Sequence, residues 1–154
     1  MSERWSAWQR LTWETVDGVS RRGAVYEVSV SHDEGVARLM RSDPEGRIYI
    51  GRTRNLRNRL RGFLRGIEQG RGHAGANIVY DMSPRQKRWF AAEVLEGRLR
   101  YRFVEAAESK QDRPERKAIL DYLHAFGELP PFNGVLPGGK GSRAQRRRAR
   151  RRTD

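Results

Sequence analysis

The sequence predicts an α/β fold of the α+β type, a small three-stranded, mainly antiparallel sheet flanked by helices on both sides. Segments in which apolar residues alternate predict strands, and longer segments with apolar residues every three or four positions predict amphipathic helices. The predicted strands are residues 24–30, 47–51 and 99–104, and the main predicted helices are residues 56–67 and 114–126. A chain of 154 residues can bury one core, so we expect one folded domain.

Composition divides the chain into three parts. They are residues 1–22, a tryptophan-rich packing segment, residues 23–137, the folded domain, and residues 138–154, an arginine-rich tail. Trp5, Trp8 and Leu11 have helical spacing, which predicts a helix that packs its rings onto the domain. The alternative is that exposed tryptophans stack on bases. The tail has nothing to bury and repels itself, so we expect it to be disordered until bound.

The first two predicted strands form a β-hairpin with a long connection. Residues 24–30 alternate as a strand does, and residues 47–51 read as its partner. The polar residues 31–46 between them end in Asp43-Pro44-Glu45-Gly46, which is a strong turn signal. We expect this connection to be partly ordered.

The remaining elements follow in order. The helix at 56–67 buries the face of Leu56, Leu60, Phe63, Leu64 and Ile67, and its other faces carry Arg57, Arg59, Arg61 and Arg65. We expect a flexible loop at 70–75, a short helix at 76–82 and the third strand at 99–104. The helix at 114–126 has one apolar face, and Pro114 suits its first turn.

The charge of the chain predicts a polyanionic partner. The net charge is +13, of which residues 140–154 carry +7 and the other 139 residues +6. Neutralising phosphates releases condensed counterions, which favours binding to a polyanion such as a nucleic acid. Cysteine is absent, which excludes disulfides and thiolate metal sites. No apolar run approaches the roughly 20 residues needed to span a bilayer, and the N-terminus lacks the order of a signal peptide, so we expect a cytoplasmic protein with no membrane partner.

Two short tyrosine motifs point to the chemistry. Gly23-Ala24-Val25-Tyr26 and Tyr49-Ile50-Gly51 each present a phenol on a strand, and an arginine-rich helix follows the second motif directly. Cleaving a phosphodiester requires an activated water, neutralised charge at phosphorus and help for the leaving oxygen. Phenols, guanidinium groups and one carboxylate are a set suited to that reaction.

The order of these features resembles the GIY-YIG nuclease family over about residues 23–133. It comprises a Gly-x-Val-Tyr strand, a Tyr-Ile-Gly strand, a helix bearing Arg59, an acidic helix start and a downstream asparagine. The resemblance implies that residues 23–137 are a GIY-YIG-like nuclease domain, and that the protein is a metal-dependent hydrolase, an endonuclease that cuts DNA. Two departures stand out: the first motif is one residue longer, and residues 31–46 form an insertion in the hairpin.

The resemblance also implies roles for individual residues. Of Tyr26 and Tyr49, one orients or deprotonates the attacking water, and Tyr26 is preferred as the base. A phenol has a pKa of about 10, so neighbouring cations must favour the phenolate. Arg59 stabilises charge on the scissile phosphate, Glu115 binds the metal, and the accessory residues are His73 and Asn133.

The implied cofactor is one divalent ion per active site, Mg²⁺ or Mn²⁺, with Mg²⁺ the default for oxygen ligands beside phosphate. The predicted DNA contacts are Arg52, Arg54, Arg57 and Arg61 on the domain, and Arg146, Arg147 and Arg148 in the tail. With one site per chain, cutting both strands requires a dimer, a partner protein, two visits, or a branched or nicked substrate.

Each assignment has a structural alternative. Tyr26 and Tyr49 could be core tyrosines, Arg57 or Arg61 could replace Arg59 if the helix rotates, and Asn133 could hold a turn. Glu115 could instead bond back to the backbone of a helix cap at Asp112. Glu105 and Glu108 are the alternative ligands if the alignment with the family slips. For the whole protein, the alternatives are a catalytically inactive nucleic-acid-binding protein (for DNA or RNA) that keeps the fold, and a subunit inactive without its partner.

Overall fold

The structure is a computed structural model, and it describes residues 4–31, 35–82, 84–90 and 97–134. In chain order the elements are β1 Gln9–Arg10, α1 Trp13–Val16, β2 Ala24–Val30, β3 Arg47–Thr53, α2 Leu56–Gln69, α3 Asn77–Tyr80, α4 Pro84–Phe90, β4 Leu99–Glu105, a short 3-10 helix Glu108–Lys110, and α5 Asp112–Phe126. The tail, with Arg146, Arg147 and Arg148, lies outside the described residues.

The sheet has four strands in the order β1-β4-β2-β3, and every neighbouring pair is antiparallel. The three predicted strands are confirmed, whereas the expectation of a three-stranded sheet is wrong. The additional strand, β1, has only two residues and pairs Gln9 with Tyr101 at the edge of β4. A segment this short carries no alternation that a sequence pattern could reveal.

The predicted N-terminal helix at Trp5, Trp8 and Leu11 is also wrong. This segment is extended and hydrogen-bonds along the sheet, with the Leu11 amide donating to the Leu99 carbonyl at 2.8 Å. The Trp8 ring lies 4.5 Å from the Arg102 guanidinium and the Trp5 ring 5.2 Å from it, on ring centroids. The two rings therefore do pack onto the domain, but over a cation rather than from a helix.

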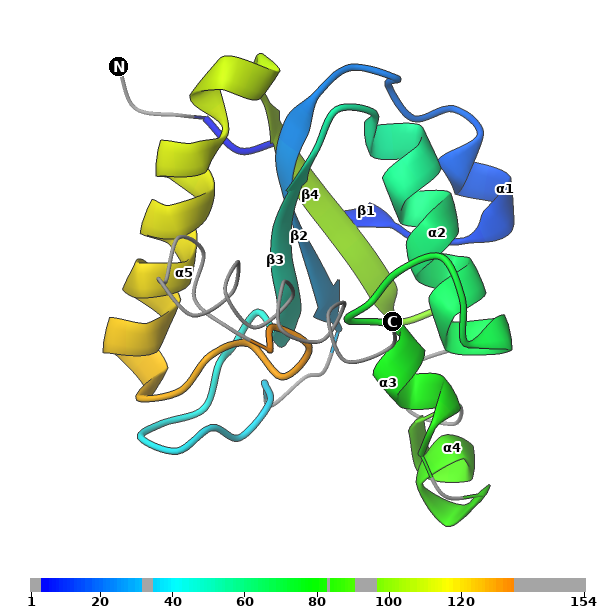
Figure 1. Cartoon of the computed structure of the whole chain (residues 1–154). Coiled ribbons are helices and arrows are strands. Elements are labelled where there is room, and N and C mark those ends of the chain that lie inside the picture. Colours follow the sequence, from blue (N-terminus) through cyan, green and yellow to red (C-terminus); the bar gives the residue numbers. More distant parts are fainter. Residues whose placement is uncertain (1–3, 32–34, 83, 91–96, 135–154) are drawn as a thin grey trace, which may run out of the picture.

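Helices cover both faces of the sheet, as Figure 1 shows. One core cluster includes Tyr26 and Val28 of β2 with Leu60 and Phe63 of α2. The second core cluster joins Ile50 of β3 to the apolar face of α5. Within the described residues, no helix is both long enough and apolar enough to cross a membrane.

The two main predicted helices are confirmed, but α2 runs two residues past its predicted end at residue 67 and α5 begins two residues before its predicted start at Pro114. Asn55 caps α2 by accepting a hydrogen bond from the Asn58 amide, and Gly70 ends the helix with a φ of 68°. The corresponding stop of α5 is Gly127, with a φ of 77°. The short helix α3 lies inside the range predicted for it, whereas α4 was not predicted.

Candidate active site

The register of the hairpin places both motif tyrosines on one face of the sheet. Tyr26 lies opposite Gly51, and Val28 lies opposite Tyr49. Opposed residues of an antiparallel pair point to the same face. The two phenol rings are consequently neighbours, with centroids 5.8 Å apart.

Two glycines make room for the Tyr49 ring. A Cβ added at Gly51 would lie 2.5 Å from Tyr49 Cε1 and 2.8 Å from its hydroxyl oxygen. A Cβ at Gly75 would lie 3.0 Å from Tyr49 Cε2 and 2.6 Å from the Phe132 carbonyl oxygen. The glycine of the Tyr-Ile-Gly motif is therefore required by the close approach of the motif's own tyrosine.

Arg59 is the arginine of α2 that reaches the phenols. Its Nε donates a hydrogen bond to the Tyr26 hydroxyl at 3.2 Å. Arg57 Nε instead donates to the Val19 carbonyl at 2.9 Å, and Arg61 pairs with Asp17. Both alternatives to Arg59 are thus turned toward the N-terminal segment.

His73 also forms a hydrogen bond with Tyr26, and a backbone contact of its ring determines which of the two residues donates. Its Nδ1 accepts a hydrogen bond from the Ala76 amide at 3.2 Å, so the neutral ring carries its proton on Nε2. Burial and the positive charge of Arg59 lower the pKa of His73 from 6.5 to about 3, which keeps the ring neutral. Nε2 therefore donates to the Tyr26 hydroxyl, 2.9 Å away.

The Tyr26 oxygen thus accepts two N–H donors. The Tyr49 ring packs beside both partners, with its centroid 5.8 Å from that of Tyr26 and 4.6 Å from that of His73. Tyr26 has no exposed surface, whereas Tyr49 lines a cavity.

The expectation that clustered cations favour the phenolates is wrong for this structure. Burial raises the pKa of Tyr26 well above its usual 10.0, and it raises the pKa of Tyr49 as well. The positive charge of Arg59 opposes the increase in both residues but does not outweigh it.

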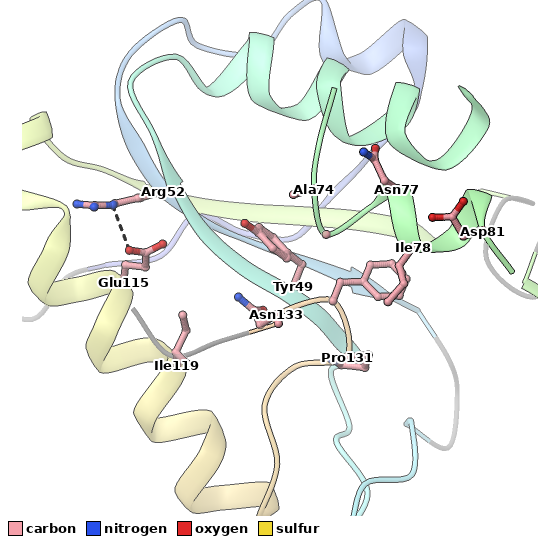
Figure 2. A pocket seen from close by; sticks show the side chains of 13 residues that line it. Tyr49, Arg52, Ala74, Asn77, Ile78, Asp81, Glu115, Ile119, Pro131 and Asn133 are labelled. Carbon is pink, nitrogen blue, oxygen red and sulfur yellow. Dashed lines mark ion pairs between the residues drawn. The ribbon is translucent and has the colours of Figure 1, made fainter. Parts of the chain in front are cut away.

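Glu115 faces the cavity from the first turn of α5. Its Oε2 lies 3.2 Å from Arg52 Nε (Figure 2). Arg52 also pairs with Asp112. Burial raises the pKa of Glu115, and the charges of Arg52 and Arg59 oppose that increase. The capping alternative is wrong, because α5 follows Gln111 without a side-chain cap.

The cavity measures about 600 Å³ and lies at the outer edge of β3, the last strand of the sheet. Its walls include Tyr49, Arg52, Asp81, Glu115, Phe132 and Asn133. In Figure 2 the Tyr49 hydroxyl points toward the side of the cavity from which Glu115 projects. Residues from β3, α3, α5 and the segment after α5 thus meet around one hollow.

Asn133 holds the segment after α5 against the edge of β3. Its Oδ1 accepts from the Ile50 amide at 2.9 Å, and its Nδ2 donates to the Ile50 carbonyl at 2.7 Å. The Phe132 amide adds a bond to the Ile48 carbonyl at 2.9 Å. Because both ends of its amide are engaged, Asn133 positions the cavity wall.

The other predicted DNA contacts and fallback ligands lie elsewhere. Arg54 pairs with Glu108 beside a separate cleft of about 270 Å³, and Glu105 pairs with Arg22. Of the arginines expected on DNA, only Arg52 lines the larger cavity among the residues described.

The bond between Arg52 and Glu115 was missed from the sequence. A usable signal existed: Tyr49 and Gly51 face α2, so strand alternation turns Arg52 toward the opposite face, where α5 packs. The alternation along β3 would therefore have predicted that Arg52 pairs with an acidic residue of α5.

The described residues contain no group of three or more His, Cys, Asp or Glu side chains that could hold a metal. Mg²⁺ commonly binds through one or two carboxylates, with water and substrate phosphate supplying the other ligands. The single carboxylate of Glu115 fits that requirement, although a bound ion would have to share it with Arg52.

Comparison of the chain with protein-family models, with curated proteins and with solved structures found no match. The resemblance to GIY-YIG nucleases therefore stays a prediction.

Proposed function

We propose that this protein is a metal-dependent endonuclease that hydrolyses DNA phosphodiester bonds in the cavity beside β3. The observation that carries the proposal is that Tyr49 and Glu115 line one cavity of about 600 Å³, with the Tyr26 ring, bonded to Arg59, packed beside that of Tyr49. Phenol, guanidinium and carboxylate together meet the three requirements of phosphodiester hydrolysis.

In this proposal Tyr49, rather than Tyr26, faces the attacking water. The full burial of Tyr26 and the place of Tyr49 on the cavity wall support this assignment. The Tyr49 oxygen accepts the water proton, while the Tyr26 ring packs beside that of Tyr49. Arg59 and His73 hold Tyr26 in this position.

The raised pKa of Tyr49 is the reason for including a metal. At neutral pH the phenol keeps its proton, so a base there needs another positive charge beside it. A divalent cation at Glu115 would supply that charge and would neutralise the phosphate oxygens. Arg52, released from Glu115, would be available to contact the phosphate.

A second candidate is a nucleic-acid-binding protein without turnover. The ion pair between Arg52 and Glu115, at 3.2 Å, favours it because it already engages the proposed ligand. A structural pair of this kind would hold α5 to β3 whether or not a metal ever binds.

Supercoiled plasmid separates these two functions. We expect nicking, then linear product, with Mg²⁺ or Mn²⁺, none with EDTA, and none with Glu115→Ala. The matched control is Glu108→Ala, which removes an acid paired to Arg54 outside the cavity and should keep its activity. Salt-sensitive binding without cleavage, on plasmid and on branched DNA, would instead select the second candidate.

A further inference from the structure

The insertion loop, which we define as residues 35–46, displays two adjacent apolar side chains. Leu39 is 75% exposed and Met40 is 70% exposed, the highest values among the large apolar side chains of the described residues. Single exposed apolar residues are ordinary, but a neighbouring pair at a loop tip is a mark of a contact surface.

The backbone beneath this pair is held firmly. Val36 and Asp43 exchange two backbone hydrogen bonds of 2.9 and 2.8 Å at the base of the loop. At the tip, the Met40 amide donates to the Phe126 carbonyl at 3.1 Å. The Arg38 guanidinium turns inward, where it donates to the Tyr122 hydroxyl at 2.5 Å.

The end of α5 forms the floor for both side chains. A Cβ at Gly127 would lie 2.7 Å from Met40 Cγ and 3.5 Å from Leu39 Cδ2. The glycine therefore lets the pair rest on the backbone with its outer surface in solvent. Fixing an apolar pair before binding lowers the entropy cost of association, so this display suits recognition.

The charges of the loop indicate the kind of partner. Its acids are paired with arginines of the sheet: Asp43 is fully buried and bonds Arg47 of β3, and Glu45 pairs with Arg102 of β4. Arg41, next to Met40, is exposed, with its guanidinium 5.2 Å from the Phe126 ring centroid. The tip thus combines apolar side chains with a cation on a chain of net charge +13, which fits a polyanion with an apolar interior.

The insertion loop contacts the C-terminal end of α5, and the cavity lies near the N-terminal end of the same helix. Glu115 is in the first turn of α5 and Phe126 is its last residue, so about 16 Å of helix separates them along the axis. That length is about five base-pair steps of DNA. In Figure 1 the insertion loop (cyan) runs beside the segment (orange) that forms a wall of the cavity.

From these observations we propose that Leu39 and Met40 form an apolar wedge that inserts between base pairs of the DNA bound at the cavity. The location of the wedge relative to the cut rests on the proposed function. Apolar wedges unstack a step and bend the duplex, at a cost that depends on the sequence of that step. The wedge would favour flexible pyrimidine–purine steps, bulges and abasic sites, where stacking is already weak.

The first test uses DNA duplexes with 2-aminopurine at successive steps, whose fluorescence rises on unstacking. We expect the wild-type protein to raise the signal at one step, and the double variant Leu39→Ala/Met40→Ala to abolish the rise and weaken binding about tenfold. The matched control, Leu39→Met/Met40→Leu, keeps the apolar volume and should retain both. Circular dichroism verifies that all three proteins are folded.

Binding to a DNA duplex that is already unstacked gives a second test. Its expected result differs from that of a purely structural role for Leu39 and Met40. On a duplex with a bulge or an abasic site at the responsive step, the alanine variant should bind within about twofold of wild type, because the unstacking cost is already met. An equal defect on both duplexes would overturn the wedge. So would an unchanged fluorescence rise in the alanine variant.

These outcomes are independent of turnover. If wild type unstacks DNA and the alanine variant does not, but neither cleaves plasmid, the wedge stands and the nuclease proposal fails. If plasmid is cleaved and all variants give the same fluorescence, the reverse holds. A change in sedimentation between wild type and the alanine variant in the absence of DNA would show that the pair joins copies of the chain, and would overturn the proposal.

Discussion

Consecutive residues of β2, Tyr26 and Glu27, face opposite sides of the sheet and meet very different surroundings. Both are almost fully buried, with exposures of 0% and 2%. Tyr26 belongs to the phenol cluster, which we define as Tyr26, Tyr49, Arg59 and His73. Glu27 belongs to the carboxylate network, defined as Glu27, Asp43, Glu45, Arg47 and Arg102.

In the carboxylate network every acid has a cationic partner. Arg102 Nε lies 2.6 Å from Glu27 Oε2, and its Nη2 lies 2.9 Å from Glu45. Arg47 Nε lies 3.2 Å from Asp43. These pairs join β2, β3 and β4 to the insertion loop, and the pairing of every acid with an arginine suits them to a structural role.

The phenol cluster is unbalanced and opens onto a cavity. It holds one cation and no acid, and N–H donors from Arg59 and His73 converge on a single oxygen of Tyr26. Burial by itself therefore does not separate the two groups. What separates them is that the phenol cluster contains a cation but no acid and reaches a cavity through Tyr49, where a reacting anion would balance its charge.

The largest expected effect is on stability and concerns Glu27. Glu27→Ala would remove the buried partner of Arg102 and leave it only the half-buried Glu45, and we expect the free energy of unfolding to fall by about 3–5 kcal/mol. Tyr26→Phe removes one hydroxyl and should cost only about 1 kcal/mol. Urea titrations of the two variants at pH 7.5 measure both values. Equal losses would remove the distinction between the two faces.

The next largest effect is on turnover and concerns Arg59. Arg59→Ala should reduce DNA cleavage by about 10²–10³-fold, the usual cost of removing one donor to a developing charge. Arg61→Ala, on the same helix but paired with Asp17 at the surface, is the matched control and should stay within a few-fold of wild type. Comparable losses in both would mean that α2 contributes only general positive charge.

The elements with long periodic patterns could be predicted from the sequence. The hairpin, α2, β4 and α5 are confirmed, because apolar periodicity records which face of an element is buried. The helix predicted from Trp5 and Trp8 is wrong for a physical reason: a spacing of three also lets both rings contact Arg102 from an extended segment. The strand β1 is too short to leave a pattern.

The candidate site could be predicted only as a set of residue types. Motif order correctly anticipated that Tyr26, Tyr49, Arg59 and His73 would lie together. It could not show which phenol faces the cavity, nor that Arg52 would bind Glu115. These contacts depend on packing between elements far apart in the chain. The sequence pattern by itself does not distinguish among the arginines of the segment 52–61.

A third prediction sharpens the geometry of the phenol cluster. In Gly51→Ala the new methyl would meet the Tyr49 ring at 2.5 Å, so the ring must move. We expect about a tenfold loss of cleavage and about 1–3 kcal/mol of destabilisation from the overpacking. Gly18→Ala, whose Cβ would meet nothing closer than 3.7 Å, is the control and should leave cleavage unchanged. A fully active Gly51→Ala variant would contradict the proposed role of Tyr49.

The smallest predicted effect is on pH dependence, where the two clusters have opposite signs. An unfolded histidine binds a proton below about pH 6.5, whereas folded His73 has a pKa of about 3. Between these values the unfolded chain binds more protons, so the contribution of His73 to stability is full above pH 6.5 and is lost as the pH falls. His73→Gln should therefore flatten the loss of stability on acidification, by up to about 1.4 kcal/mol per pH unit.

Glu27 acts in the other direction. Burial raises its pKa above the usual 4.5, although Arg102 opposes the increase. Between pH 4.5 and the folded pKa of Glu27, the folded chain therefore binds more protons than the unfolded chain. The contribution of Glu27 is present at low pH and is lost as the pH rises through the folded pKa, and Glu27→Gln should steepen the loss of stability on acidification. Urea titrations of wild type and both variants from pH 7.5 to pH 4.5 give the slopes independently of absolute stability. Slopes that change in the same direction would show that one shared electrostatic environment, rather than two separate clusters, surrounds β2.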